Sequence, residues 1–484
     1  MNGSTRLAWF LALLISGTPL APVVDAAEDA KAAAAKPNVL FIAIDDLNDW
    51  IGAYGKRKDV QTPHLDRLAG RGMLFTRAYC AAPACNPSRT ALMTGVRPST
   101  SGVYHNNQPW RPVMRDKVTL AQHFMQAGYI VRAGGKIFHN SFNDLRSWQH
   151  YEPTGRFGHP KQRALEGTSH FDWGAMTGGD DEMGDTHVVD WAIDFLKQPH
   201  DKPFFLATGM IRPHLPFYAP QKYFDLYPLA SVRRPEVKSD DLADVPPAGV
   251  KMARPDGDHK TVVEAGEWEH AVQSYLACIS YVDGQIGRLI EALDKSPHAN
   301  NTIVILWSDH GWHLGEKEHW RKFALWEEAT RVTMMAVVPG MTHANQRCDR
   351  TVSLLDIYPT LVEVCGLPPR EGLEGRSLAS LLRDPASPRE EPAITTHGKD
   401  NHAVRSERWR YIRYADGSEE LYDHDADPRE WTNVAGEPSY APAKAQLAKW
   451  LPQVNAPDAP SQNEKGRDKA QQGKRKAKKT KATR

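Results

Sequence analysis

Apolar runs that could form buried strands alternate along the chain with segments of helical periodicity. The runs at 39–44 (VLFIAI) and 303–307 (IVILW) are continuously apolar, which is typical of strands covered on both faces. Further strands are predicted at 129–135 and 202–210, and helices at 62–72, 118–129 and 267–296. Strands that alternate with helices in this way favour an α/β fold, with a mostly parallel sheet between two layers of helices.

One short helix is predicted in the stretch 85–95, CNPSRTALMTG. Asn86 is a good N-cap, the proline after it suits the first helical position, and Gly95 suits the end. Cys85 would then lie just outside the helix N-terminus, where free N–H groups and the helix dipole favour an anion. Arg89, one turn into the helix, adds a positive charge. The pattern therefore predicts a chemically reactive environment around Cys85.

The pattern changes after a proline-rich stretch at 367–392. Beyond it, polar and aromatic side chains alternate, and Asp416-Gly417 is a common turn between antiparallel strands. We therefore predict a large α/β domain at 37–390 and a small antiparallel subdomain at 391–455.

The N-terminal segment is typical of an export signal. Residues 1–26 contain Arg6, then a short apolar stretch, then small residues, and cleavage is predicted after Ala26. Residues 27–36 are predicted to be a linker. The protein is therefore expected to be periplasmic or secreted.

The C-terminal segment is basic. Residues 464–484 hold ten Lys or Arg and two acids, with no apolar side chain larger than Ala. Such a segment cannot bury enough surface to fold, so 456–484 is predicted to be a disordered tail. Its charge would suit weak contact with an anionic polymer, and no nucleic-acid partner is expected.

The chain has five cysteines and no C-x-x-C pair. Cys85 is set apart by its motif. The other four could pair in an oxidising compartment, and the sequence leaves their pairing open; they are Cys80, Cys278, Cys348 and Cys365.

Acidic residues follow the two most apolar strands. Asp45 and Asp46 end the first run, and Asp309 and His310 end the second. In an open parallel sheet, ligands bind beyond the carboxyl ends of the strands, so these side chains are expected to converge. Carboxylate oxygens favour a hard cation, and the sequence predicts one Ca²⁺ or Mg²⁺ ion there, with His310 as the least typical ligand.

Basic residues occur in short motifs near other predicted strand ends. GGKIFH contains Lys136 and His139, RPHLPF contains His214 between two prolines, and HWRKFALW contains Lys322. Together with Arg89 they would make a positive pocket beside the metal. Such a pocket suits an oxyanion with charge on several oxygens, and its displacement.

These motifs, taken together, resemble a known enzyme family. CNPSRTALMTG is similar to the signature of the formylglycine-dependent sulfatases, Cys-x-Pro-Ser-Arg followed by Thr-Gly. GKIFH, RPHLPF and SDHGWHLGEKEHWRKF resemble the iduronate-2-sulfatase-like branch in order and spacing. The resemblance implies an alkaline-phosphatase-like fold, with the catalytic domain at 37–390 and a C-terminal α+β subdomain.

The resemblance also implies a role for each motif residue. Cys85 would be converted to formylglycine by a formylglycine-generating or sulfatase-maturating enzyme, and its hydrated aldehyde would attack sulfur. Ca²⁺ would be held by Asp45, Asp46, Asp309 and His310 together with residue 85. Arg89 and His139 would orient the diol, Lys136 and Lys322 would bind sulfate oxygens, and His214 would protonate the leaving alcohol.

The expected substrate is a sulfated saccharide, with a terminal 2-O-sulfated uronate as the candidate. The resemblance puts His214, Trp312, His402 and Arg405 around the pocket rim. Arg405 could bind the uronate carboxylate there or instead form a structural ion pair. Two other functions remain open at this point. One is a phosphomonoesterase, phosphodiesterase or phosphonate hydrolase of the same superfamily, and the other is a non-catalytic protein that binds sulfated glycans.

Overall fold

The computed structural model describes residues 1, 3, 36–160, 162–165 and 170–462. The helices and strands given below lie in one compact unit, Pro37–Arg484. The predicted signal peptide and linker, apart from residues 1, 3 and 36, lie outside the described residues, as does the basic end after residue 462.

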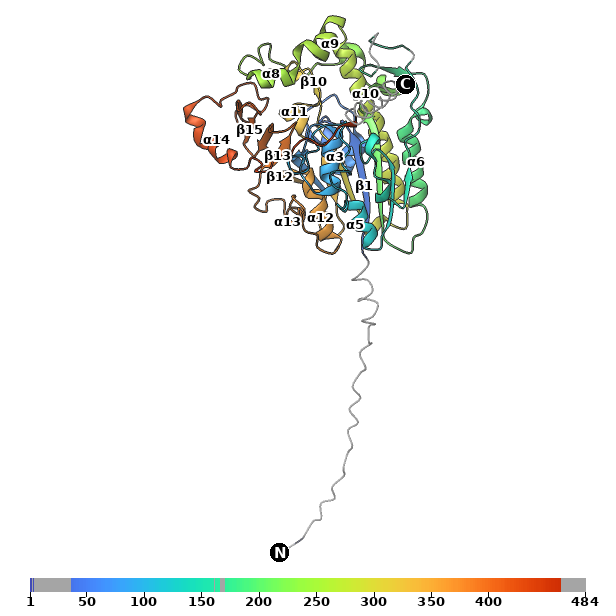
Figure 1. Cartoon of the computed structure of the whole chain (residues 1–484). Helices are drawn as coiled ribbons and strands as arrows, with labels where there is room; N and C mark the ends of the chain where they lie inside the picture. Colours follow the sequence, from blue (N-terminus) through green and yellow to red (C-terminus); the bar gives the residue numbers. More distant parts are fainter. Residues whose placement is uncertain (2, 4–35, 161, 166–169, 463–484) are drawn as a thin grey trace, which may run out of the picture. The chain divides into compact units, whose positions relative to one another are not determined.

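A mixed sheet of eight strands forms the centre of this unit (Figure 1). Its strand order is β12-β2-β11-β8-β1-β6-β3-β4. Neighbouring strands are parallel except where β11 pairs with β8 and with β2. The strands are β1 Asn38–Asp45, β2 Met73–Tyr79, β3 Ile130–Gly135, β4 His150–Glu152, β6 Phe204–Pro213, β8 Thr302–Ser308, β11 Met334–Val337 and β12 Gln346–Ser353. The predicted mostly parallel sheet is confirmed.

Helices cover both faces of this sheet (Figure 1). They are α2 Pro63–Ala69, α3 Cys85–Thr94, α4 Pro98–Ser101, α5 Leu120–Gln126, α6 Gly184–Leu196, α7 Gln221–Phe224, α8 Pro247–Ala253, α9 Lys260–Ala265, α10 Trp268–Asp294, α11 Glu327–Thr330, α12 Ile357–Val364, α13 Ala379–Arg383 and α14 Ala441–Ala448. Two small strand pairs join β5 Trp173–Met176 to β7 Phe217–Pro220, and β9 His313–Leu314 to β10 Trp320–Arg321.

Alternate residues of β1 belong to two separate cores. Leu40, Ile42 and Ile44 pack with residues of α2, α6 and α10. Val39, Phe41 and Ala43 pack with residues of α3, α5 and α12. Side chains alternate between the faces of a strand, so a strand buried on both faces reads as a continuous apolar run. Its polar side chains then stand at its end, which is where the acidic residues lie.

The Cys85 helix begins earlier than the sequence predicts. Helix α3 starts at Cys85 itself, and its N-cap is Ala84, whose side chain makes no capping bond. Asn86 was expected to be the cap, but its amide instead donates to the carbonyls of His105 (3.0 Å) and Gln108 (2.8 Å). The loop at 105–108 therefore takes the side chain that would have capped the helix. The predicted end at Gly95 is confirmed, with a φ of 69°.

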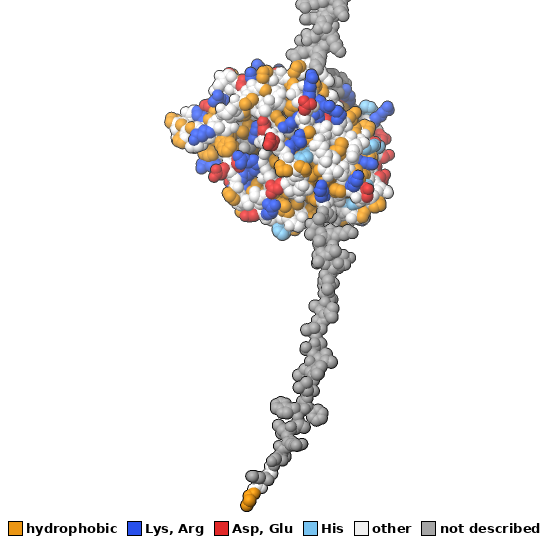
Figure 2. All heavy atoms as spheres, turned by 60° about the horizontal axis from the view of Figure 1, so that its bottom comes forward, with side chains coloured by type: hydrophobic (Ala, Val, Ile, Leu, Met, Phe, Trp, Pro, Cys, Tyr) orange, Lys and Arg blue, Asp and Glu red, His pale blue; other side chains and the backbone are white. Residues whose placement is uncertain are grey.

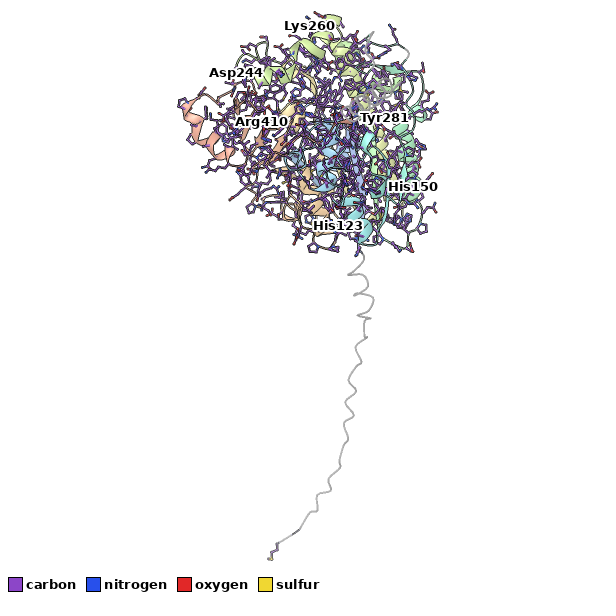
Figure 3. The ribbon with its side chains drawn as sticks, viewed as in Figure 1. His123, His150, Asp244, Lys260, Tyr281 and Arg410 are labelled. Carbon is purple, nitrogen blue, oxygen red and sulfur yellow. The ribbon has the colours of Figure 1, made fainter. Side chains whose placement is uncertain are left out.

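The predicted antiparallel subdomain contains a four-stranded sheet. Its strands, in order along the chain and across the sheet, are β13 Ala393–Thr396, β14 His402–Arg405, β15 Trp409–Arg413 and β16 Glu419–Asp423. The turn between β15 and β16 contains Asp416-Gly417, and Gly417 has a φ of 86°, which glycine adopts without strain. Arg410, labelled in Figure 3, is fully buried where this sheet meets the large one.

The chain stays folded beyond the predicted start of the tail. The backbone N–H groups of Ala456, Ala459 and Gln462 donate to carbonyls of the 99–107 segment at 2.7, 2.8 and 3.0 Å. Ala459 is only 5% exposed. The predicted boundary at residue 456 is therefore too early, because backbone bonds hold this segment and composition alone does not reveal them.

All five cysteines are buried and unbridged, so the structure forms none of the disulfides that the sequence left open. In the described part of the chain, no helix combines the length and the apolar character needed to cross a membrane. Basic, acidic and apolar side chains are intermingled over the face shown in Figure 2.

Candidate active site

The end of β1 presents two adjacent carboxylates. The pairing of β1 with β6 shifts register between Ile44 and Asp45, and Asp46 has a φ of 63°. Asp tolerates this left-handed conformation better than most residues, and the resulting break in the strand turns both side chains toward one site. The N–H of Asp46 donates to Oδ1 of Asp309 at 3.1 Å, which ties β1 to the end of β8.

The end of β8 supplies Asp309 and His310. Strands β1 and β8 are parallel neighbours with Ile44 opposite Ser308, so their carboxyl ends meet as predicted. The hydroxyl of Ser88 on α3 donates to the carbonyl of Asp309 at 2.6 Å. This bond fixes the start of the Cys85 helix against the strand end.

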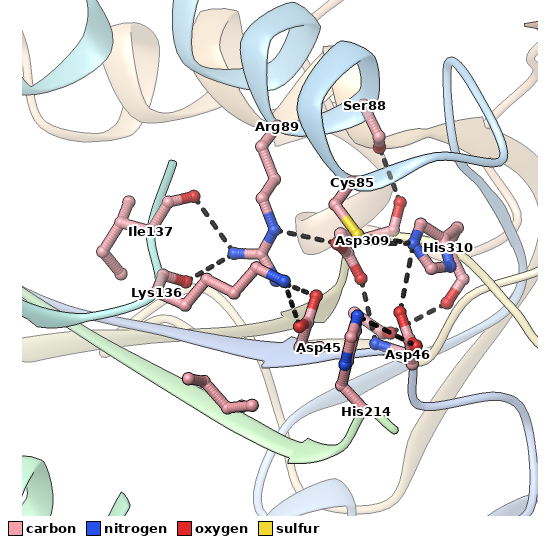
Figure 4. A network of polar contacts seen from close by, with 12 residues as sticks. Asp45, Asp46, Cys85, Ser88, Arg89, Lys136, Ile137, His214, Asp309 and His310 are labelled. Atoms are coloured by element: carbon pink, nitrogen blue, oxygen red, sulfur yellow. Dashed lines mark hydrogen bonds and ion pairs between the residues drawn. The ribbon is translucent and has the colours of Figure 1, made fainter. Parts of the chain in front are cut away.

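These elements bring five possible ligands together (Figure 4). One atom each from Asp45, Asp46, Cys85, Asp309 and His310 lies within 4.8 Å of the others, and all five residues are buried. The thiol of Cys85 is 3.4 Å from Nε2 of His310. The predicted convergence of the acids with Cys85 is therefore present in the structure.

Arg89 holds two of the carboxylates in place. Its Nε donates to Asp309 at 2.8 Å and its Nη2 donates to Asp45 at 3.0 Å. Its Nη1 donates to the backbone carbonyls of Lys136 and Ile137. Because the guanidinium is fully buried and all its contacts are fixed, Arg89 sets the spacing between the ends of β1, β3 and β8.

Lys136 reaches the site from the end of β3, where its ammonium forms an ion pair with Asp45. The turn that carries it needs two glycines. A Cβ on Gly135 would lie 1.9 Å from the carbonyl oxygen of Gly209, and one on Gly209 would lie 2.4 Å from the Lys136 backbone. The glycines of GGKIFH and FFLATGM therefore allow β3 and β6 to approach closely at the site.

Lys322 reaches the site from the segment directly after β10. Its ammonium binds both oxygens of Asp46, at 2.7 and 2.8 Å, and lies 4.9 Å from the ring of Trp312. Its neighbours Arg321 and Phe323 both have positive φ, 76° and 74°. Two residues with positive φ on either side of one lysine are an unfavourable backbone conformation, which the surrounding structure must stabilise. Such conformations are common at functional sites.

Two histidines lie at the edge of this cluster. His214 follows β6, its Nε2 is 3.7 Å from Asp46, and its side chain is 17% exposed. Burial, together with Lys322 and Lys136, keeps the pKa of His214 well below its usual range. Burial and then Lys136 lower the pKa of His139 to about 4. Both imidazoles are therefore neutral near pH 7 in this structure.

The charges of the cluster alter its acids and its thiol. Burial raises the pKa of Asp46 to about 7, although Lys322 opposes the rise. Burial also acts on Asp45, but Lys136 and Arg89 hold its pKa well below the usual range. For Cys85, burial is outweighed by Lys136 and Lys322, which lower the pKa of the thiol and favour the thiolate.

His310 is the most basic imidazole of the site. Burial lowers its pKa, but Asp309, Asp46 and Cys85 raise it to about 9. Its Nδ1 lies 3.0 Å from the carbonyl of Gly311, and its Nε2 faces Cys85 and the carboxylates. Nε2 is thus the atom available either to a cation or to a proton.

The residues present fit a hard divalent cation. Three carboxylates converge on one point, and oxygen ligands suit Ca²⁺. Burial disfavours the charged form of Asp46, so this side chain gains stabilisation from any cation bound beside it. Three positive side chains, Arg89, Lys136 and Lys322, surround the same point and suit an anion.

Three predicted rim residues lie elsewhere. Trp312 is fully buried beneath Lys322. His402 is 4% exposed, and its Nδ1 contacts the hydroxyl of Thr396 at 3.0 Å. Arg405 is 4% exposed and pairs with Glu327 at 3.2 Å. The prediction that Arg405 binds substrate is therefore wrong, and its alternative, a structural ion pair between subdomains, describes what it does.

Sequence reasoning missed two residues that support the site. Ser88 lies inside the Cys85 motif, so its position could have indicated its contact with Asp309. Tyr275 lies in the middle of α10, and its hydroxyl donates to the carbonyl of Asp46 at 2.7 Å. Nothing in the periodicity of α10 distinguishes this tyrosine from an ordinary core residue.

Comparison with known proteins agrees with this geometry. The sulfatase family model matches residues 37–367, and the model "N-sulphoglucosamine sulphohydrolase, C-terminal" matches residues 315–457. A sulfatase of Formosa agariphila is 42% identical over 445 residues, which are 87% of each chain. Human iduronate 2-sulfatase is 32% identical over 387 residues, 69% of this chain and 70% of the relative.

Among solved structures, the phosphonate monoester hydrolase of Agrobacterium radiobacter superposes with a TM-score of 0.72 at 24% identity, covering 86% of this chain and 94% of that one. At that identity the likeness concerns the fold alone. The chain belongs to the sulfatase family, and it is a sulfuric ester hydrolase. The predicted family and enzyme class are thus confirmed.

Proposed function

We propose that this protein hydrolyses sulfate esters of a sulfated saccharide, using a formylglycine made from Cys85 and one bound Ca²⁺ ion. The observation that carries this proposal is the position of Cys85. It is the first residue of α3 and shares one buried cluster with three carboxylates, and three positive side chains surround it.

Ca²⁺ and formylglycine would each supply a distinct part of the chemistry. Asp45, Asp46, Asp309 and His310, with residue 85, would hold Ca²⁺, which stabilises negative charge on oxygen. Formylglycine supplies a hydrated aldehyde, whose two hydroxyls allow both attack on sulfur and the later release of sulfate. Cys85 would first have to be oxidised by a formylglycine-generating or sulfatase-maturating enzyme, which we propose as a partner.

The chain's own residues would bind and orient the sulfate group. Lys136 pairs with Asp45 and Lys322 pairs with Asp46, so both ammonium groups lie at the cluster and can donate to sulfate oxygens. Arg89 keeps the strand ends in register, so that these donors stay fixed during reaction. Fixed donors stabilise developing negative charge without reorganisation.

His139 and His214 are proposed to move protons. A neutral His139 can accept a proton from residue 85, because its pKa of about 4 leaves it unprotonated near pH 7. His214 would donate a proton to the leaving alcohol. Its lowered pKa means that it must gain this proton when the anionic substrate is bound, since nearby negative charge raises the pKa of an imidazole.

A terminal 2-O-sulfated uronate is the proposed substrate. The supporting observation is the similarity to human iduronate 2-sulfatase, whose name gives a uronate and the 2-position of its sulfate. Arg405 takes no part, because it is buried in an ion pair with Glu327.

We also propose export to the periplasm or the medium, from the signal-like pattern at 1–26. N-terminal sequencing of the mature protein should then begin at Ala27. The basic end is proposed to contact an anionic polymer weakly, which would show as salt-dependent retention on an anionic resin that is lost on truncation after residue 462.

Assay of released sulfate and released phosphonate from matched esters tests the function. We expect sulfate release from a 2-O-sulfated uronate disaccharide, and little reaction of a phosphonate monoester. Faster turnover of the phosphonate ester would favour the alternative reaction.

A further inference from the structure

A large cavity opens beside the reactive cluster. It has a volume of about 890 Å³, within the range of small-ligand sites. Its walls come from α8, the β10 loop, residue 105, and the two turns of the C-terminal sheet around residues 397–401 and 415–416. None of the residues proposed to react lines it.

The cavity joins the reactive cluster through Lys322. Phe323 lines the cavity, and its ring is 5.7 Å from Nζ of Lys322. His319 also lines it, and its Nε2 contacts the backbone carbonyl of Lys322 at 2.7 Å. The N–H of Phe323 donates to the carbonyl of Pro83, two residues before Cys85. A substrate whose sulfate lies between the lysines would therefore extend its remaining part toward this cavity.

The wall near Lys322 is aromatic. The ring of Phe323 lies 5.9 Å from that of His397, which in turn lies 6.2 Å from that of His105. Burial lowers the pKa of His397 to about 3, so it is a neutral hydrogen-bonding ring. This part of the cavity can contact a sugar ring.

The end of α8 carries two cations of the cavity wall that have no partner among the described residues, and the carbonyl of Ala253 there lies 2.6 Å from Nδ1 of His319. Lys251 and Arg254, at the end of α8, are exposed, and their side chains make no hydrogen bond or ion pair with any described residue. The cavity's other charged groups are already engaged. Arg321 pairs with Asp258, and the Asp416 carboxylate accepts from Ser418.

We propose that Lys251 and Arg254 bind a second anionic group of the substrate, a carboxylate or a sulfate on the part that remains after the reacting sulfate is cleaved. This inference rests on the proposed function and adds a binding site to it. It replaces Arg405 as the source of selectivity for acidic saccharides. Unpaired lysine and arginine side chains in one cavity bind such groups through charge-assisted hydrogen bonds.

The test compares kcat/KM for four substrates. The full substrate is a 2-O-sulfated uronate disaccharide with a sulfate on its second sugar. Two trimmed disaccharides lack either the uronate carboxylate, which is reduced, or the sulfate on the second sugar. The fourth substrate is an aryl sulfate. We expect Lys251→Gln and Arg254→Gln each to lower kcat/KM for the full disaccharide about tenfold, mainly through KM, and to leave the aryl sulfate unchanged. Lys260→Gln, on neighbouring α9 (labelled in Figure 3) and outside the cavity, is the matched control.

The two trimmed disaccharides identify the anion. Removing the group that the cations bind should lower kcat/KM of the parent enzyme about tenfold. On that substrate, Lys251→Gln and Arg254→Gln should then cause no further loss. The proposal would be overturned if the two variants lost kcat/KM equally on every substrate. It would also be overturned if they lowered kcat/KM on both trimmed disaccharides as much as on the full one.

Binding measurements separate this proposal from the proposed function. Calorimetric titration of the full disaccharide into Cys85→Ala, with and without Arg254→Gln, needs no turnover. If the parent enzyme releases no sulfate but Arg254→Gln still weakens binding, the proposed function fails and the anion site stands. If the parent enzyme is active and Arg254→Gln does not alter binding, only the anion site fails.

Discussion

At the scale of single residues, Cys85 is the side chain on which the proposed chemistry depends. Its thiol contacts His310, and it lies among the carboxylates without being part of either apolar core. We predict that Cys85→Ala lowers sulfate release by about 10³-fold or more and leaves the unfolding temperature nearly unchanged. Sulfate assays and calorimetry measure the two effects.

Cys80→Ala is the matched control for that substitution. Cys80 is equally buried but contacts the carbonyl of Ala329 at 3.9 Å, outside the cluster. This variant should keep its activity. Undiminished sulfate release by Cys85→Ala would refute the role given to residue 85.

A second prediction at this scale concerns the cation. We expect one calcium ion per chain, at the cluster that contains Asp45, Asp46 and Asp309, because the second group of possible ligands, Glu327, His424 and Glu430, is already paired with Arg410. Asp45→Ala or Asp309→Ala should lose this ion and all measurable sulfate release. Each should also reduce stability, because Arg89 loses one of its two buried carboxylate partners.

Elemental analysis after dialysis measures the ion content. Asp190→Ala removes an exposed carboxylate in the middle of α6, outside the cluster, and should leave the calcium content unchanged. Two zinc ions per chain in the parent protein would contradict the calcium assignment.

Some residue roles could be read from the sequence and others could not. Asp45, Asp46, Asp309 and His310 end apolar strands, so their convergence follows from the rule that parallel strands end at one edge. No comparable rule predicts where the side chain of Arg405 lies. Its burial depends on Glu327, which is 78 residues away in the chain, and no local pattern encodes that pairing.

At the scale of elements, a buried ionic cluster joins the small sheet to helix α11 of the large domain. Arg410 on β15 pairs with Glu327 and Glu430, and His424 contacts Glu430 at 2.8 Å. Although burial raises it, Arg410 and His424 lower the pKa of Glu430 to about 2, from an ordinary value of 4.5.

The lowered pKa gives a prediction for stability against pH. A carboxyl whose folded pKa lies below its unfolded value stabilises the fold above the unfolded pKa and loses this effect as the pH falls. The free energy of unfolding should therefore decrease between about pH 4.5 and pH 2. Glu430→Gln should be less stable by about 3 kcal/mol at pH 7 and should lose less stability over that range.

Urea unfolding at several pH values checks this prediction. Asp194→Asn, at an exposed position on α6, is the control and should keep the slope of the parent protein. Identical slopes for Glu430→Gln and the parent would contradict the assignment of this pH dependence to Glu430.

Element boundaries were less predictable than element types. The strands β1, β3, β6 and β8 occur where apolar runs predict them. Helix α3 does not start where the sequence predicts, because the side chain of Asn86 is hydrogen-bonded to the loop at 105–108 and does not cap the helix. The chain end at 456–462 is likewise held by backbone bonds to residues 99–107. Contacts of this kind depend on the tertiary fold, and local propensity does not report them.

At the scale of the whole molecule, α8, the segment around β10 and the turns of the small sheet together line a cavity next to the reactive cluster. The large sheet supplies the strand ends, and the turns of the small sheet supply one wall of the cavity. Both sheets could be predicted from the sequence. The cavity could not, since Lys251 and Arg254 belong to no motif and become significant only where α8 faces those turns.

The central claim is that residue 85 of the active enzyme is formylglycine. Mass spectrometry of the peptide that contains residue 85, from protein made in a host with a maturating enzyme, tests it most directly. The account predicts the mass of the aldehyde or its hydrate, with an extent of conversion that rises in proportion to specific activity. Full sulfatase activity in a preparation whose Cys85 is an unmodified thiol would contradict it.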